Sequence, residues 1–159
     1  MKIFDSKSSK KISFNPLKEG KVSLYVCGMT VYDSCHIGHL RTFLSFDFIV
    51  KSFRAINYDV HYVRNITDVD DKIIAKAKSE NTSPSAISEK YIQEMHDDFS
   101  SMSMLSPDVE PKVTELLKEL DKKNTQKTNL NEVFQQVYRK YTVENLDTFK
   151  EFFKILFKN

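Results

Sequence analysis

The most informative segment of this chain is YVCGMTVYDSCHIGH, residues 25–39. Two of the three glycines in the whole chain, Gly28 and Gly38, lie in this stretch. Glycine carries no side chain, so it lets the backbone approach another group closely. Two histidines, His36 and His39, flank the second glycine and add ring nitrogens that can donate hydrogen bonds. The stretch therefore predicts a loop that lies against a ligand.

Regular structure is expected on both sides of this loop. Residues 21–28 alternate apolar and polar side chains, which predicts a strand that enters the core. Residues 37–56 predict a helix, because apolar side chains recur there at helical spacing. The apolar stripe consists of Phe43, Phe46, Ile49, Val50 and Phe53. A second strand is expected over residues 58–65, and this order of elements predicts a right-handed crossover in a parallel sheet, hence an α/β fold.

The sequence before and after this unit predicts shorter elements. Residues 2–4 and 11–14 are expected to pair as short strands. Ser83 followed by Pro84 is typical of a helix start and predicts a helix that runs to about residue 104.

A proline-bounded segment, SPDVEP at residues 106–111, predicts an interruption of the helical structure. Two or three more helices are expected after it. We therefore divide the chain into residues 1–115 and a helical tail over residues 116–159. The tail holds five of the 12 phenylalanines, so we expect it to pack against something.

The start of the helix at residue 37 is suited to an anion. A helix N-terminus has unpaired N–H groups and the positive end of the helix dipole, and both favour a phosphate. We therefore predict a phosphate site formed by His36, Gly38 and His39. The alternative is that the two histidines only cap the helix and pack, which would not explain two glycines in one loop.

The composition is that of an ordinary globular chain of 159 residues, 40% hydrophobic and 29% charged, with a net charge of +2. No apolar run is long enough to span a membrane, and the N-terminus does not resemble a signal peptide, so we expect a cytoplasmic protein without membrane contact. Lys and Arg do not cluster, which neither favours nor excludes an RNA partner. The two cysteines, Cys27 and Cys35, are expected to be thiols or a metal ligand rather than a disulfide.

Three segments together resemble cysteinyl-tRNA synthetase, a class I aminoacyl-tRNA synthetase. They are YVCGMTVYDSCHIGHLRT (25–42), YVRNITDVDDKI (62–73) and SPDVEP (106–111). H-I-G-H marks the class, whereas C-G-x-T-V-Y-D and N-I-T-D-x-D-D-K mark the cysteine enzyme. The resemblance runs almost continuously from about residue 2 to residue 115. It implies the first half of a Rossmann-like catalytic domain, a parallel sheet with helices.

The resemblance implies a reaction in two steps. Cysteine and ATP give cysteinyl-adenylate and pyrophosphate, and the cysteinyl group then moves to tRNA(Cys). It also implies that His36 and His39 stabilise the charge that develops on the phosphates of ATP, while Gly38 makes room for them. Catalysis of this kind consists mainly of positioning and electrostatic stabilisation.

The resemblance further assigns residues to cysteine and to zinc. Gly28, Thr30 and Thr67 match positions that line the cysteine pocket; their structural alternatives are a strand end, a β-former and a helix N-cap. Cys27 matches a zinc ligand, and a zinc ion that binds the substrate thiolate would separate cysteine from serine. Without the resemblance, a cysteine on a strand is more often a small buried apolar residue.

Parts of the family's pattern are not found in this sequence. We find no further matching zinc ligands, no K-M-S-K-S-like loop and no helical domain that reads tRNA. A zinc site needs at least three protein ligands, and only Cys27 matches one. We therefore expect weak or no aminoacylation by this polypeptide alone. A missing carboxy-terminal half would make it a truncated product, an incomplete reading of a longer gene or one piece of a split enzyme.

Three other classes of protein stay open. A small adenylyltransferase shares H-x-G-H but needs a late Ser/Thr and Arg motif that the tail does not show. A cysteine-activating ligase of thiol biosynthesis would use the same ATP and cysteine sites. A non-catalytic ATP-binding module would use the phenylalanine-rich tail to cover the edge of the sheet.

The remaining polar candidates are expected to have structural roles. The sequence Thr67-Asp-Val-Asp70 fits a helix start with aspartates in the first turn, and a direct ligand role for the aspartates is the alternative. Cys35 is expected to pack, and His61 and His96 are expected to be structural.

Overall fold

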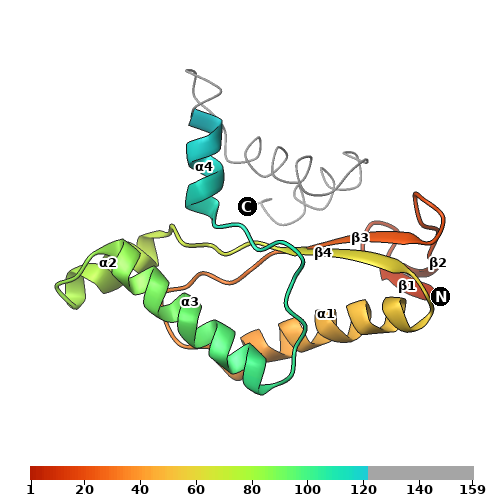
Figure 1. Cartoon of the computed structure of the whole chain (residues 1–159), viewed down its shortest axis with the longest axis horizontal. Coiled ribbons are helices and arrows are strands. Elements are labelled where there is room, and N and C mark those ends of the chain that lie inside the picture. Colours follow the sequence, from red (N-terminus) through yellow and green to blue (C-terminus); the bar gives the residue numbers. More distant parts are fainter. Residues whose placement is uncertain (122–159) are drawn as a thin grey trace.

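The computed structural model describes residues 1–121, so most of the helical tail expected over residues 116–159 lies outside the described residues. Figure 1 shows the order and arrangement of the helices and strands. In chain order they are β1 (Lys2–Asp5), β2 (Lys10–Ser13), β3 (Lys21–Val26), α1 (Ile37–Ala55), β4 (Asp59–Arg64), α2 (Asp71–Ser79), α3 (Pro84–Ser101) and α4 (Val113–Asp121). None of these helices is both long enough and apolar enough to cross a membrane.

The centre of the fold is the unit β3–α1–β4. The two strands are parallel, with Lys21 beside Asp59 at one end and Val26 beside Arg64 at the other. Helix α1 connects them and packs against both strands. This confirms the predicted α/β fold with a parallel sheet, and each element lies within three residues of its expected bounds.

A further segment, residues 106–111, runs beside β4 along the edge opposite β3, and we call it the edge segment. The sequence did not predict its pairing with β4. The N–H of Arg64 donates to the carbonyl of Val109 (3.1 Å), and the N–H of Ile66 donates to the carbonyl of Pro111 (2.9 Å). The prolines of SPDVEP predict only an interruption of regular secondary structure. Proline fits here because Pro111 contributes its carbonyl oxygen to the pairing, which does not need the N–H that proline lacks.

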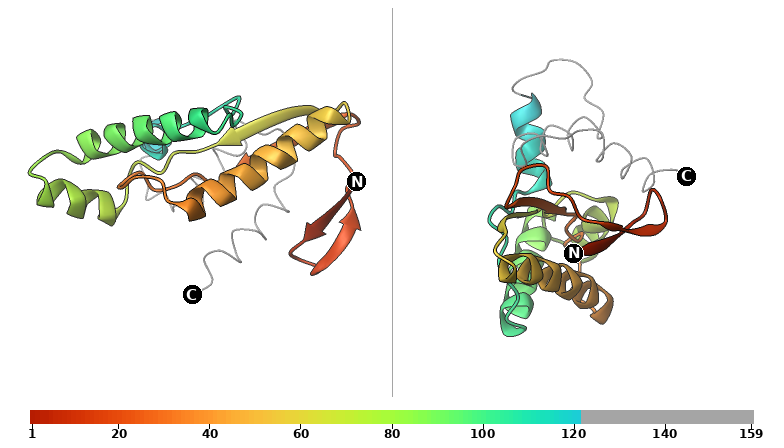
Figure 2. Two further views of the ribbon diagram at one scale, coloured as in Figure 1. Left: turned by 90° about the horizontal axis from the view of Figure 1, so that it is seen from below. Right: turned by 90° about the vertical axis from the view of Figure 1, so that its right-hand side faces the viewer.

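The core lies between the strand pair and the helices on one side of it. Figures 1 and 2 show α1 and α3 on the same side of β3 and β4, and α4 on the other side. The rings of Phe43 on α1 and Phe99 on α3 lie 5.0 Å apart and join the two helices. The predicted stripe of α1 is confirmed: Phe43, Val50 and Phe53 are buried, and the other two members pack partly buried against them.

The two N-terminal strands pair antiparallel, as predicted, and form a hairpin beside the end of α1 (Figure 1). Phe14, just after β2, attaches this hairpin to the rest of the fold. Its ring lies 4.8 Å from that of Phe53 and 6.1 Å from that of Tyr58.

A buried arginine fastens the edge segment to β4. Arg64 is 4% exposed, and its guanidinium lies 2.5 Å from a carboxylate oxygen of Glu110. The same guanidinium lies over the rings of Phe43 (5.3 Å) and Phe99 (4.8 Å). The second oxygen of Glu110 is 2.6 Å from Nε2 of His96, which has the structural role expected for it.

Helix α3 begins as predicted, with Ser83 as its N-cap and Pro84 in its first turn. It ends at Ser101 rather than near residue 104. Met102 is the C-cap, and Ser103 has a φ of 54°, a left-handed conformation that a helix cannot include.

Candidate functional site

Helix α1 begins with a capping box made of two histidines. His36 is the N-cap, and its Nδ1 accepts from the N–H groups of Gly38 (3.1 Å) and His39 (3.4 Å). In return, Nδ1 of His39 accepts from the N–H of His36 (3.4 Å). The two imidazole rings are stacked, with centroids 3.7 Å apart and planes 17° apart. The structure therefore brings His36, Gly38 and His39 together at the start of α1.

These hydrogen bonds fix the tautomer of both neutral rings. A backbone N–H can only donate, so each accepting Nδ1 carries no proton, and the ring proton lies on Nε2. No protein acceptor among residues 1–121 engages Nε2 of His36 or His39. Desolvation, and then the neighbouring imidazole, lowers the pKa of His39, which favours its neutral form. Two neutral N–H donors thus lie side by side at the positive end of a helix.

Gly38 is required by the position of the His36 ring. A Cβ atom at Gly38 would lie 2.9 Å from Cε1 and 3.0 Å from Nδ1 of His36. Any larger residue would push the ring away from the helix start. The Nδ1 atoms of the two histidines therefore cap the helix, which was the alternative to a phosphate site. Their Nε2 atoms stay available to a ligand.

Gly28, Thr30 and Thr67 meet where β3 and β4 end. Thr30 and Thr67 lie side by side in a parallel bridge, and the N–H of Val31 donates to the carbonyl of Thr67 (3.2 Å). A Cβ atom at Gly28 would lie 1.6 Å from the carbonyl oxygen of Asn65, so only glycine fits this contact. We call these three predicted residues the strand-end cluster.

Asn65, which the sequence did not single out, organises the strand-end cluster. It is 1% exposed and directly follows β4. Its Oδ1 accepts from the hydroxyl of Tyr25 (2.8 Å) and from the N–H of Gly28 (3.0 Å), and its Nδ2 donates to Oγ1 of Thr67 (3.2 Å). A polar amide in a run of buried residues is the signal that could have identified it.

Cys27 lies on the loop beside the strand-end cluster, with its sulfur 3.8 Å from the carbonyl oxygen of Gly28. Although the residue is exposed, desolvation by the protein atoms around the sulfur raises the pKa of the thiol. Among residues 1–121, no group of three or more His, Cys, Asp or Glu side chains could hold a metal ion. The described residues therefore offer one zinc ligand and do not fit a complete zinc site.

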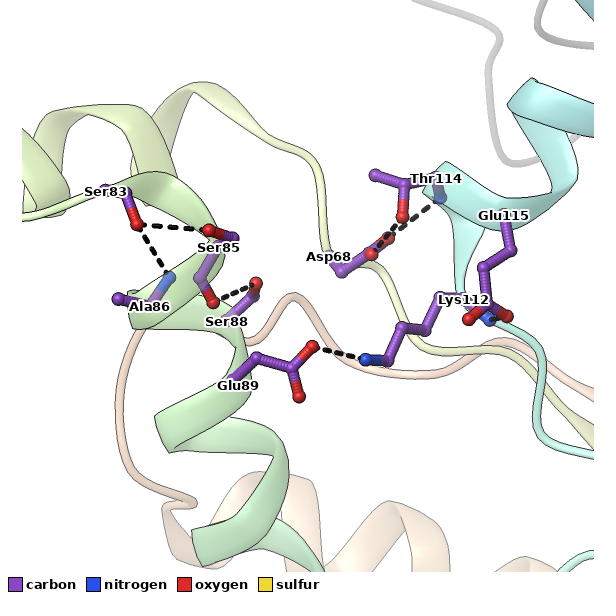
Figure 3. A network of polar contacts seen from close by, with 9 residues as sticks. All are labelled: Asp68, Ser83, Ser85, Ala86, Ser88, Glu89, Lys112, Thr114 and Glu115. Atoms are coloured by element: carbon purple, nitrogen blue, oxygen red, sulfur yellow. Dashed lines mark hydrogen bonds and ion pairs between the residues drawn. The ribbon is translucent and has the colours of Figure 1, made fainter.

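Asp68 and Asp70, which follow β4, have structural contacts, and Figure 3 shows those of Asp68. Asp70 is the N-cap of α2 and accepts from the N–H of Lys72 (2.8 Å). The N-cap that was the structural alternative for Thr67 therefore lies at Asp70, and Thr67 pairs with Thr30 just beyond the end of β3. Asp68 points to the start of α4, where it accepts from the backbone N–H (3.0 Å) and the hydroxyl of Thr114.

Cys35 and His61 also have the structural contacts predicted for them. The sulfur of Cys35 lies 3.4 Å from that of Met29, and burial raises the pKa of the Cys35 thiol to about 11. His61 lies on β4 with Nδ1 3.9 Å from a carboxylate oxygen of Asp108.

A shallow apolar groove runs along the outer face of α1 rather than at the histidine pair. It is lined by Ile37, Leu40, Arg41, Leu44, Ser45, Phe48, Ile49 and Met102. None of the site residues predicted from the sequence lines it.

Comparison with known proteins identifies the family. Residues 13–151 match the family of tRNA synthetases class I (C) catalytic domain. A cysteine–tRNA ligase of Aliivibrio salmonicida (strain LFI1238) is 52% identical over 120 residues, which are 76% of this chain and 26% of that protein. A cysteine–tRNA ligase of Shewanella sp. (strain W3-18-1) is 53% identical over 114 residues, which are 72% of this chain and 25% of that protein.

The chain thus spans about a quarter of the length of the curated relatives that it matches. The family match covers the β3–α1–β4 unit, the histidine pair and the strand-end cluster. It also extends past residue 115, and the division of the chain at that position stays a prediction. The chain belongs to the cysteinyl-tRNA synthetase family of class I catalytic domains, as its motifs predicted.

Proposed function

We propose that this chain carries the ATP-binding and cysteine-binding elements of a cysteine–tRNA ligase. The observation that supports this most strongly is the stacked histidine pair at the start of α1, with a neutral N–H donor on each ring. Phosphate oxygens are strong acceptors, and a helix N-terminus favours negative charge. In the proposal, His36 and His39 donate to the phosphates of ATP, while Gly38 leaves space for the His36 ring.

The proposed reaction is the activation of cysteine. A carboxylate oxygen of cysteine attacks the α-phosphorus of ATP, the bond from that phosphorus to the bridging oxygen breaks, and pyrophosphate leaves with the electron pair. Negative charge grows on the phosphate oxygens as this happens, so donors that are already in place stabilise the transition state. The cysteinyl group of the adenylate then passes to the terminal ribose of tRNA(Cys).

We further propose that the strand-end cluster binds cysteine. In α/β folds, ligands bind outside the carboxyl ends of parallel strands, where Gly28, Thr30 and Thr67 lie. The proposal places the chain in the cytoplasm, with ATP, cysteine and tRNA(Cys) as its partners. Cys27 stays a predicted zinc ligand, and no step of the proposed reaction depends on zinc.

The test of this proposal is ATP binding, followed by pyrophosphate exchange. Calorimetric titration with ATP should show binding to the wild-type chain. His39→Ala should weaken this binding about tenfold or more, because a hydrogen bond to a charged oxygen is lost. The matched control is His61→Ala, which removes a histidine on β4 and should leave the ATP affinity unchanged.

The outcomes separate a cysteine-activating enzyme from a non-catalytic ATP-binding module. Exchange of labelled pyrophosphate into ATP that requires cysteine supports a cysteine-activating enzyme. ATP binding without exchange favours a non-catalytic module. Absence of ATP binding, or equal binding by wild type and His39→Ala, would remove the phosphate role of the histidine pair.

A further inference from the structure

The side chain of Asn65 contacts residues at the ends of both strands beside the proposed cysteine site. Its Oδ1 accepts from Tyr25 and Gly28, and its Nδ2 donates to Thr67. We infer that Asn65 is a positioning residue that holds the Thr67 hydroxyl as a hydrogen-bond donor to the carboxylate of the amino-acid substrate. This inference rests on the proposed function of the strand-end cluster.

The orientation of the Asn65 carboxamide follows from its partners. The N–H of Gly28 can only donate, so the atom that faces it at 3.0 Å must be the carbonyl oxygen. The NH₂ group is then the atom that faces Thr67. Since an amide nitrogen only donates, Oγ1 of Thr67 accepts in this contact.

An accepting role leaves the Thr67 hydroxyl with its own proton to donate. No acceptor for this proton is found among the protein groups of residues 1–121. An amino acid offers one strong acceptor, its carboxylate, because the ammonium group can only donate and a thiol accepts weakly. The Thr67 hydroxyl therefore matches the carboxylate, which is also the group that reacts with ATP in the proposed reaction.

The surroundings hold this arrangement in place before any substrate binds. Asn65 is buried, and its backbone carbonyl touches Gly28 so closely that a Cβ atom there would lie 1.6 Å away. The N–H of Thr67 donates to the carbonyl of Met29 (3.3 Å), which fixes the backbone on its other side. A group fixed in advance loses little freedom on binding, so its hydrogen bond contributes more to affinity.

Two substitutions test the inference in the full chain. Thr67→Val keeps the shape of the side chain and removes the hydroxyl. Asn65→Asp keeps an acceptor for Tyr25 and Gly28, but a carboxylate cannot donate, so the Thr67 hydroxyl would turn its proton toward it. Each change should raise the dissociation constant of L-cysteine about tenfold or more, the usual effect of losing one hydrogen bond to a charged group.

The control is Tyr25→Phe, which removes one bond to Oδ1 and leaves both contacts of Asn65 to the strand-end cluster. It should change the L-cysteine affinity by about twofold at most. The double variant Asn65→Asp/Thr67→Val should bind no more weakly than either single variant, because both remove the same donor. Amide hydrogen exchange at Gly28 should stay slow in Asn65→Asp. This result would show that the loop keeps its structure and that only the hydrogen bond from residue 65 to Thr67 is lost.

The outcomes are distinct for the inference and for the proposed function. If the wild-type chain does not bind L-cysteine, the proposed cysteine site is wrong and the inference falls with it. If the wild type binds but Thr67→Val binds equally well, the inference alone is overturned, and this holds even if Asn65→Asp does not fold. Losses that add in the double variant would also overturn it, because the two residues would then act independently.

Discussion

Replacing Gly38 by alanine tests the histidine pair through two effects of opposite sign. Gly38 is the second residue of α1, where alanine is favoured over glycine by up to about 1 kcal/mol, the value for a helix interior. However, the new Cβ would lie 2.9 Å from the His36 ring, which is on a side chain and can rotate away. Rotation breaks the two hydrogen bonds that cap α1, and loss of an N-cap costs about 0.5–2 kcal/mol.

The two effects nearly cancel, so Gly38→Ala should leave the free energy of unfolding within about 1 kcal/mol of the wild type. ATP binding should nevertheless weaken about tenfold or more, because the displaced His36 ring no longer directs its N–H beside that of His39. Urea unfolding measures the first quantity and calorimetric titration measures the second.

Ser45→Ala is the matched control on the same helix. Ser45 is exposed, and its hydroxyl donates to the carbonyl of Arg41 in the preceding turn. The change should stabilise α1 by a few tenths of a kcal/mol, roughly the difference in helix propensity, and should leave ATP affinity unchanged. A Gly38→Ala chain that is more stable by about 1 kcal/mol and binds ATP normally would refute the role assigned to Gly38.

Three further predictions concern pH and buried groups. Since His39 binds a proton less readily in the folded chain, its stabilising contribution is complete above its unfolded pKa of about 6.5 and is lost as the pH falls below that value. His39→Gln, whose amide can keep the capping role, should reduce this loss in urea unfolding between about pH 8 and pH 5. Gly28→Ala should destabilise the chain by about 3 kcal/mol or more in the same assay, because its Cβ would overlap a backbone carbonyl. Arg64→Met should cost about 3 kcal/mol, because Glu110 would keep only its contact with His96; an unchanged midpoint would contradict this.

The β3–α1–β4 unit could be predicted because its signals are local. A strand shows a period of two and a helix a period of 3.6 along the sequence, and both periods were visible. The edge segment over residues 106–111 gave no such signal. Its prolines suggested a break, whereas its pairing with β4 uses carbonyl groups that proline retains. Local patterns cannot show which carbonyl groups will be needed by a distant strand.

Prediction of the candidate site was limited in the same way, because local patterns do not show contacts between distant residues. The motif predicted that His36 and His39 act together, but the reason for Gly38 became visible only with the position of the His36 ring. Asn65 was missed because its partners Tyr25 and Gly28 lie 40 and 37 positions earlier in the chain. Asp68 was expected at the start of α2, yet its partner is 46 positions later. Polar contacts across such separations depend on the tertiary fold.

In the proposed function, two neutral imidazoles, each with its proton on Nε2, bind the phosphates of ATP at the start of α1. Nitrogen-15 NMR of the histidine side chains measures the tautomer directly. We expect the Nε2–H tautomer for both His36 and His39 near neutral pH, with signals that shift and saturate as ATP is added. An Nδ1–H tautomer on either ring, or signals that stay unchanged at saturating ATP, would contradict it.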